Sequence, residues 1–173
     1  VYVASVNDDA AALISHDVRQ VLERNVERMA LDIPVPIGRQ TDEDASTGVD
    51  RLLNAAAAYD QLKQAAIVVD AGTAVTIDFV DGEGTFHGGA ILPGARMMLQ
   101  AMDEHTAQLP AVEFQAPDEA IGHNTQQAML TGVFHGIRGA VRELTEKFAE
   151  QYGAYPAVIA TGGDGRMLFE GYE

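Results

Sequence analysis

The sequence predicts a mixed α/β protein. Short β-branched runs alternate with longer segments in which apolar residues recur at helical spacing, and glycine or proline stands between them. Of the 173 residues, 47% are apolar and 21% are charged, which is enough for a buried core and too apolar for a disordered chain. At this length we expect one domain or two small ones.

The first third of the chain predicts a strand and two helices. Val1–Val6 is a β-branched run and predicts the strand. A helix capped by Ser15 should follow, because a set of apolar residues keeps helical spacing there: Val18, Val21, Leu22, Val26 and Met29. A polar, acidic loop over 41–46 then leads into an alanine-rich helix over 50–62, whose composition indicates burial.

The middle of the chain predicts a three-stranded meander and a helix. The expected elements are strands at 67–70, at 75–80 and from Thr85 onward, a hairpin at 81–84, and a methionine-rich helix at 95–105. We expect Gly88 and Gly89 to interrupt the third strand, because glycine is unfavourable inside strands.

The last third predicts one long helix and one strand. An irregular linker between Pro110 and Pro117 precedes a helix over 124–152, with Gly153 as its C-cap. Three glycines recur at helical spacing in this helix, at positions 132, 136 and 139. Each costs up to about 1 kcal/mol relative to alanine, so we expect close packing there as compensation. The final strand covers 157–160.

Charge and composition exclude several classes of function. The net charge is −15, from 11 basic and 26 acidic residues, which argues against a nucleic-acid partner. The absence of cysteine excludes disulfides, thiolate zinc sites and cysteine nucleophiles. The five histidines lack metal-ligand spacing, and no Walker A, dinucleotide or nucleophile-elbow motif is present. With no signal peptide and no apolar run of about 20 residues, we expect a cytoplasmic protein with no membrane partner.

Two segments combine acidic and turn-forming residues in a way that favours phosphate chemistry. Asp70–Thr76 places a carboxylate at a strand end before a glycine turn with two threonines, which suits a phosphate and a cation; an ordinary β-turn is an equally good interpretation. Asp50 and Arg51 begin a buried helix, which would place them at the edge of a cleft. Taken alone, they are better explained as a helix cap and a surface ion pair.

Three further segments have weaker signals. Gly88–Gly94 contains three glycines and a proline, which usually serve backbone shape. The segment 121–125 precedes the long helix and could bind an anion, although N-capping by Asn124 is the simpler interpretation. Thr161-Gly162-Gly163 follows a strand and would let a nucleotide lie against the backbone.

Taken in order, these segments resemble the type III pantothenate kinases, members of the acetate kinase/sugar kinase/Hsp70/actin superfamily. The matching segments are 48–51, 70–78, 88–94, 106–110, 121–125 and 161–163. The resemblance implies an actin-like, ribonuclease H-like ATPase fold. In that fold, 1–64 would be part of the N-terminal domain and 65–173 most of the C-terminal domain.

The resemblance also implies a reaction, ATP-dependent phosphorylation of pantothenate to 4'-phosphopantothenate, the first step toward coenzyme A. Asp50 matches the general base, and Gly48, Val49 and Arg51 match the segment that holds pantothenate. Thr125 matches a pantothenate contact made across a homodimer interface. The family uses Mg2+ or another divalent cation with ATP. By the same resemblance, Asp70 matches the ligand of a monovalent cation (K+ or NH4+), and Gly72 and Thr73 match the segment that contacts ATP phosphate. Thr161, Gly162 and Gly163 match the family's adenosine motif.

One family motif is absent from the sequence. The Asp-x-Gly-Asn-Thr phosphate loop, which opens the family's chains, would precede Val1. We therefore expect either a fragment of a longer kinase or a degenerate relative. The alternative functions are a catalytically impaired member that acts as a regulatory or binding protein, and a different kinase of the same superfamily.

Overall fold

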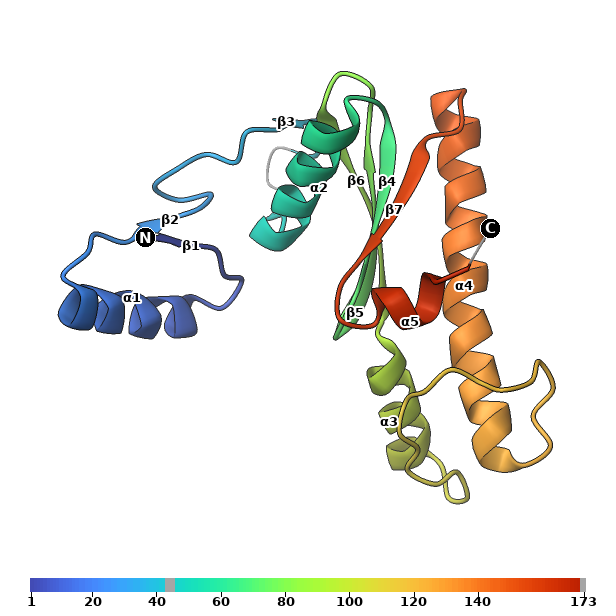
Figure 1. Cartoon of the computed structure of the whole chain (residues 1–173). Helices are drawn as coiled ribbons and strands as arrows, with labels where there is room; N and C mark the ends of the chain where they lie inside the picture. The colour runs from blue at the N-terminus through green and yellow to red at the C-terminus, as the bar shows by residue number, and fades with distance from the viewer. Residues whose placement is uncertain (43–45, 172–173) are drawn as a thin grey trace.

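A five-stranded mixed sheet forms the centre of the computed structural model, which describes residues 1–42 and 46–171 (Figure 1). The strands follow the order β3 (Gly38–Arg39), β6 (Thr85–Pro93), β5 (Ala74–Val80), β4 (Ala66–Ala71) and β7 (Ala157–Thr161). The three central strands form the expected antiparallel meander. β7 pairs with β4 and β3 with β6, both in parallel.

Helices cover both faces of this sheet (Figure 1). α2 (Val49–Leu62) lies on one face, where Leu52 packs with Val80 and Phe86. On the other face lie α3 (Ala95–His105), α4 (Thr125–Tyr152) and α5 (Gly165–Phe169). Strand residues alternate between the two faces, so Ile67 and Ile77 belong to the larger core with α4. The sequence prediction of a buried 50–62 helix is confirmed.

The long helix α4 has the predicted ends. The Asn124 side chain accepts a hydrogen bond from the Gln127 amide (2.9 Å), and Gly153 adopts a left-handed φ of 82° at the C-cap. The predicted close packing at the three glycines is wrong for the single chain. Positions 132, 136 and 139 are exposed, and no described atom lies within 4 Å of a Cβ built on any of them.

The third strand is continuous, against our expectation of an interruption at Gly88 and Gly89. Phe79 pairs with Gly88 but Val80 pairs with Phe86, so His87 is an extra residue in a β-bulge, and Gly88 absorbs it with a φ of 92°. Gly89 permits the close strand approach, since a Cβ there would collide with the Ile77 carbonyl oxygen.

The N-terminal residues form a separate small unit (Figure 1). β1 (Tyr2–Val3) pairs in parallel with β2 (Glu27–Arg28), and α1 (Asp8–Leu22) connects them. The predicted strand over 1–6 is therefore shorter than expected.

The predicted limits of the first helix are wrong at both ends. Asn7 caps α1, because its side chain accepts from the Ala10 amide, while Ser15 lies inside the helix and its hydroxyl donates to the Ala11 carbonyl oxygen (2.6 Å). The helix ends before Glu23, which has a left-handed φ of 50°, so Val26 lies outside it.

The predicted acidic loop at 41–46 lies partly outside the described residues. Among the helices of the described residues, none has the length and apolarity needed to cross a bilayer.

Candidate active site

The Asp70 turn connects β4 to β5 and lies against the start of α3. The Gly72 amide donates to the Ala74 carbonyl oxygen (2.9 Å), and the Gly94 amide donates to the Thr73 carbonyl oxygen (3.0 Å). A Cβ at Gly94 would collide with the Gly72 and Thr73 carbonyl oxygens. Gly94, at the end of the 88–94 segment, is therefore required for this close approach, and two of the predicted motifs meet here.

The Thr161-Gly162-Gly163 turn lies directly beside Asp70. Thr161 is the register partner of Asp70 in the parallel β4–β7 pair. Gly162 has a φ of 89°, and a Cβ on it would lie 2.5 Å from the Asp70 Oδ1 atom. The structure thus brings together the residues that the sequence predicted for the cation and the nucleotide.

Asp70 also contacts α2, through a residue that the sequence analysis missed. Asn54 Nδ2 donates to Asp70 Oδ2 at 2.7 Å. Asn54 lies four residues after Asp50, and residues at this spacing share one face of a helix. Asp50 and Asp70 therefore lie on the same side of the sheet. The spacing from Asp50 was visible in the sequence, but the partner of Asn54 was not.

Asp50 lies in the first turn of α2, where its side chain is exposed and folds back on the backbone. Its Oδ1 atom accepts from the Arg51 amide at 2.9 Å. A Cβ on Gly48 would lie 2.5 Å from the same oxygen, so glycine leaves room for this carboxylate. Gly48 and Val49 line a cleft of about 350 Å³ against the N-terminal unit. This cleft therefore borders the two residues before Asp50, while Asp50 and Arg51 themselves are not among the residues that line it.

Arg51 does not form the predicted surface ion pair with Asp50, because its guanidinium pairs with Asp78 on β5. Arg51 Nε donates to both carboxylate oxygens, at 3.0 and 3.1 Å, and Nη2 donates to Oδ1. The guanidinium also lies 5.6 Å from the centre of the Phe86 ring. Asp78 is only 2% exposed.

Burial raises the pKa of Asp78, while the Arg51 guanidinium and the Thr76 hydroxyl lower it by less. The nearby Asp50 charge raises it further. Asp50 directly precedes Arg51, whose guanidinium binds Asp78, so Asp50 also lies near the sheet face that carries Asp78.

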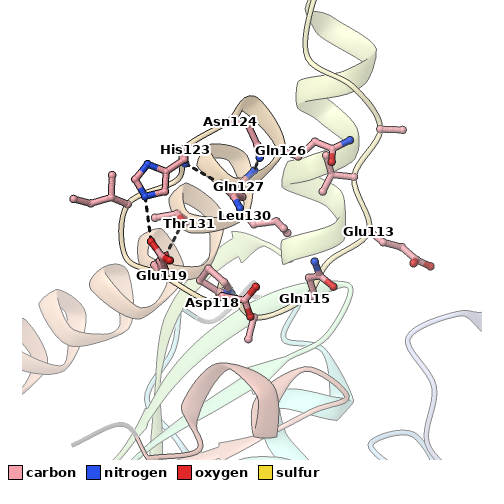
Figure 2. A pocket seen from close by; sticks show the side chains of 15 residues that line it. Glu113, Gln115, Asp118, Glu119, His123, Asn124, Gln126, Gln127, Leu130 and Thr131 are labelled. Atoms are coloured by element: carbon pink, nitrogen blue, oxygen red, sulfur yellow. Dashed lines mark hydrogen bonds and ion pairs between the residues drawn. The ribbon is translucent and has the colours of Figure 1, made fainter.

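Thr125 is not brought to Asp50 within one chain. It is the exposed first residue of α4, and α4 covers the face of the sheet opposite to α2 (Figure 1). Next to it, the 111–119 linker and the start of α4 enclose a polar cavity of about 480 Å³. Figure 2 shows that the His123 ring faces the Glu119 carboxylate there. His123 Nε2 lies 3.1 Å from Glu119 Oε2, and the His123 amide donates to Gln127 Oε1 (2.9 Å).

The oxygen atoms around Asp70 fit a hard cation. Carboxylate and carbonyl oxygens are donors that hard cations prefer, and a Cβ on Gly162 would collide with both Asp70 Oδ1 and the Ala71 carbonyl oxygen, so both oxygens lie close to this glycine. In the described part of the chain, no group of three or more acidic or histidine side chains could hold a metal alone. A cation at Asp70 would therefore need further ligands besides this carboxylate, such as backbone oxygens or water.

Comparison with known proteins gives the family. The model of the type III pantothenate kinase family matches residues 1–147. The chain belongs to this family. The type III pantothenate kinase of Akkermansia muciniphila is 33% identical over 99% of the chain and 73% of its own length. That of Rhodospirillum rubrum is 42% identical over 76% of the chain, which spans about half (51%) of that relative.

A solved structure shares the fold. A Campylobacter jejuni protein, described as belonging to the Baf family of transcriptional activators, superposes with a TM-score of 0.68. The match covers 99% of this chain and 72% of that one at 23% identity. The mixed α/β class predicted from the sequence is confirmed by this likeness and by the five-stranded sheet.

Proposed function

We propose that this pantothenate kinase family member contributes an acceptor site and part of a nucleotide site for the ATP-dependent phosphorylation of pantothenate to 4'-phosphopantothenate. The observation that carries the proposal is the hydrogen bond from Asn54 to Asp70, which connects the Asp50 helix to the nucleotide side of the site. The fold expected for this activity is the actin-like one, with 1–64 in the first domain and 65–173 in the second.

In this proposal Asp50 accepts the proton of the pantothenate hydroxyl as the phosphoryl group is transferred. Phosphoryl transfer needs mainly positioning and charge neutralisation, so an exposed carboxylate beside the acceptor hydroxyl is adequate. Gly48, Val49 and Arg51 would hold pantothenate, and the cleft beside Gly48 gives it an entrance.

Gly72, Thr73 and the 161–163 turn would hold ATP in the same proposal. Asp70 would hold K+ or NH4+. When bound, the monovalent cation and Mg2+ neutralise charge on the nucleotide phosphates.

Thr125 completes the proposed site only in a homodimer. Within one chain it belongs to the helix on the opposite face of the sheet from Asp50. A second copy could supply its Thr125 to the first copy's acceptor site, as the family resemblance implies. The exposed glycine positions of α4 leave a surface that a second helix could approach closely.

A regulatory or binding role is the second candidate. It is favoured by the likeness to the Campylobacter jejuni protein, whose description is that of a transcriptional activator. The net charge of −15 disfavours direct contact with DNA phosphates, so such a role would act through another protein.

Substitution of Asp50 tests the kinase proposal. We expect the full-length protein to form 4'-phosphopantothenate from pantothenate and ATP, and Asp50→Ala in the same protein to lose at least 100-fold of this turnover, the usual contribution of a general base. Asp60→Ala is the matched control, since Asp60 lies at the other end of α2 in a surface pair with Lys63. Product formation is measured by mass spectrometry.

The possible results separate the two candidates. Near-normal turnover by a folded Asp50→Ala chain would remove Asp50 from its role. No turnover by the full-length wild-type protein, under conditions that support a known family member, would favour the regulatory candidate.

A further inference from the structure

We propose that Asp78 is a positioning residue for pantothenate binding, which acts by fixing the orientation of the Arg51 guanidinium. This inference rests on the proposed function, because it concerns the same acceptor site. It adds a residue from β5, 27 positions away in sequence, to the segment 48–51.

The first argument is burial. Asp78 is 2% exposed and the Arg51 side chain 17% exposed, so both charges are largely removed from water. Such a pair contributes little net stability compared with well-packed apolar residues, and removing one partner leaves an expensive unpaired charge. A role in orientation would explain why a buried ion pair is present at the start of α2.

The second argument is the geometry of the guanidinium. Its described hydrogen bonds use Nε and Nη2, both directed to Asp78. A guanidinium is a planar fork with five donor hydrogens. With the Nε hydrogen and one Nη2 hydrogen directed to Asp78, the two Nη1 hydrogens and the second Nη2 hydrogen remain as donors for an oxygen of the acceptor substrate.

The third argument is the surroundings of the pair. The centre of the Phe86 ring lies 5.6 Å from the guanidinium carbon, and the Thr76 hydroxyl is a second hydrogen-bond partner of the Asp78 carboxylate. Asp50, the proposed base, is the residue directly before Arg51. Fixing Arg51 on the sheet therefore also fixes the first turn of α2, where Asp50 lies.

A double-mutant cycle on pantothenate affinity tests the role. Binding to the intact chain is measured by isothermal titration calorimetry for the wild type, Asp78→Asn, Arg51→Met and the double variant. We expect Asp78→Asn to weaken pantothenate binding about tenfold or more, within the range of directly coupled residues. In the Arg51→Met background, Asp78→Asn should not weaken pantothenate binding further, because the guanidinium that Asp78 orients has been removed.

Two controls separate positioning from folding. Asp81→Asn removes a pair with His87 on the same hairpin (2.8 Å) and should leave pantothenate affinity unchanged. ATP affinity of Asp78→Asn should also stay at the wild-type value, which a general loss of folded protein would not allow. If Asp78→Asn does not fold, Asp78→Glu keeps the charge but displaces the guanidinium, and it should show the same weakening.

Each contrary result has a distinct meaning. Wild-type pantothenate affinity in a folded Asp78→Asn or Asp78→Glu chain overturns the role of Asp78 but leaves the proposed function standing. The same holds if Asp78→Asn weakens pantothenate binding by the same factor with and without Arg51→Met. A wild-type chain that binds no pantothenate overturns both this role and the proposed function.

Discussion

At the scale of single residues, Asp70 is where the predicted nucleotide contacts converge. Its carboxylate accepts from Asn54 on one oxygen and lies against Gly162 at the other. The local motif around Asp70 was visible in the sequence because it is continuous. Its neighbours Asn54 and Gly162 come from elements far apart along the chain, and only the strand register brings them together.

We expect turnover to depend on a monovalent cation at Asp70. Replacing K+ or NH4+ by tetramethylammonium should lower kcat by about tenfold or more, equivalent to about 1.4 kcal/mol of transition-state stabilisation. Asp70→Asn should have low turnover with all three cations, because the carboxylate that binds the monovalent cation is lost. Steady-state assays at constant ionic strength measure both effects, and equal turnover in all three salts would contradict the cation site.

Arg51 and Asp78 illustrate what the sequence could not reveal at this scale. The resemblance included both residues in matching segments but gave no indication that they pair. Their partnership depends on which face of β5 meets α2, and that face is set by the alternation of Thr76, Asp78 and Val80 toward the smaller core. A shift of one residue would have directed Asp78 toward α4 instead.

At the scale of elements, prediction succeeded where the signals are local. The N-cap and C-cap of α4 were correctly assigned to Asn124 and Gly153. The predicted start of α1 is too late, because the apolar spacing begins only at Val18. The signal for the true start is Asn7, whose side chain caps the helix ahead of an acidic first turn. Polar first turns carry no hydrophobic periodicity, so only the capping residue marks them.

The glycines of α4 provide a test of what covers this helix. For the single chain we expect Gly136→Ala to raise the free energy of unfolding by up to about 1 kcal/mol, since the position is exposed and helical. Gly153→Ala is the control and should lower it, because Gly153 has a φ of 82°. Urea denaturation measures both.

Whether Gly136→Ala raises or lowers the free energy of unfolding shows whether this position of α4 is covered. A lower free energy of unfolding would contradict an uncovered position and would indicate that another chain packs closely against α4. The measurement is therefore made over a range of protein concentrations, since a dimer gives concentration-dependent stability.

At the scale of the whole molecule, the N-terminal unit differs from the rest in how little it buries. Val21 is 77% exposed and Leu13 65% exposed, whereas Ile137 of α4 is fully buried. Of the predicted set of apolar residues, Val21 and Leu22 on α1 are exposed, whereas Val26, after the helix, is buried. The apolar side of α1 therefore does not form a core-facing surface at these two positions. The sequence could not show this, because periodicity reports an apolar side of a helix but not what it packs against.

We expect limited trypsin digestion to cleave the N-terminal unit first. Cuts at Arg19 or Arg24 should occur at least tenfold faster than cuts at Arg138 or Arg142 of α4, because segments with few buried apolar contacts open more often. Mass spectrometry of the timed fragments gives the order. Equal cleavage rates at the two pairs of sites would show that the N-terminal unit is as protected from trypsin as α4.

The position of β7 at the margin of the sheet has a practical consequence for handling this protein. Its sequence Ala-Val-Ile-Ala-Thr contains no lysine, glutamate or proline, the residues that usually discourage one sheet from extending into another. Among the described strands none pairs with the outer side of β7, and backbone groups on such an edge are a template for pairing with a neighbouring molecule. Concentrated or partly unfolded samples are therefore at risk of growing ordered aggregates from this strand.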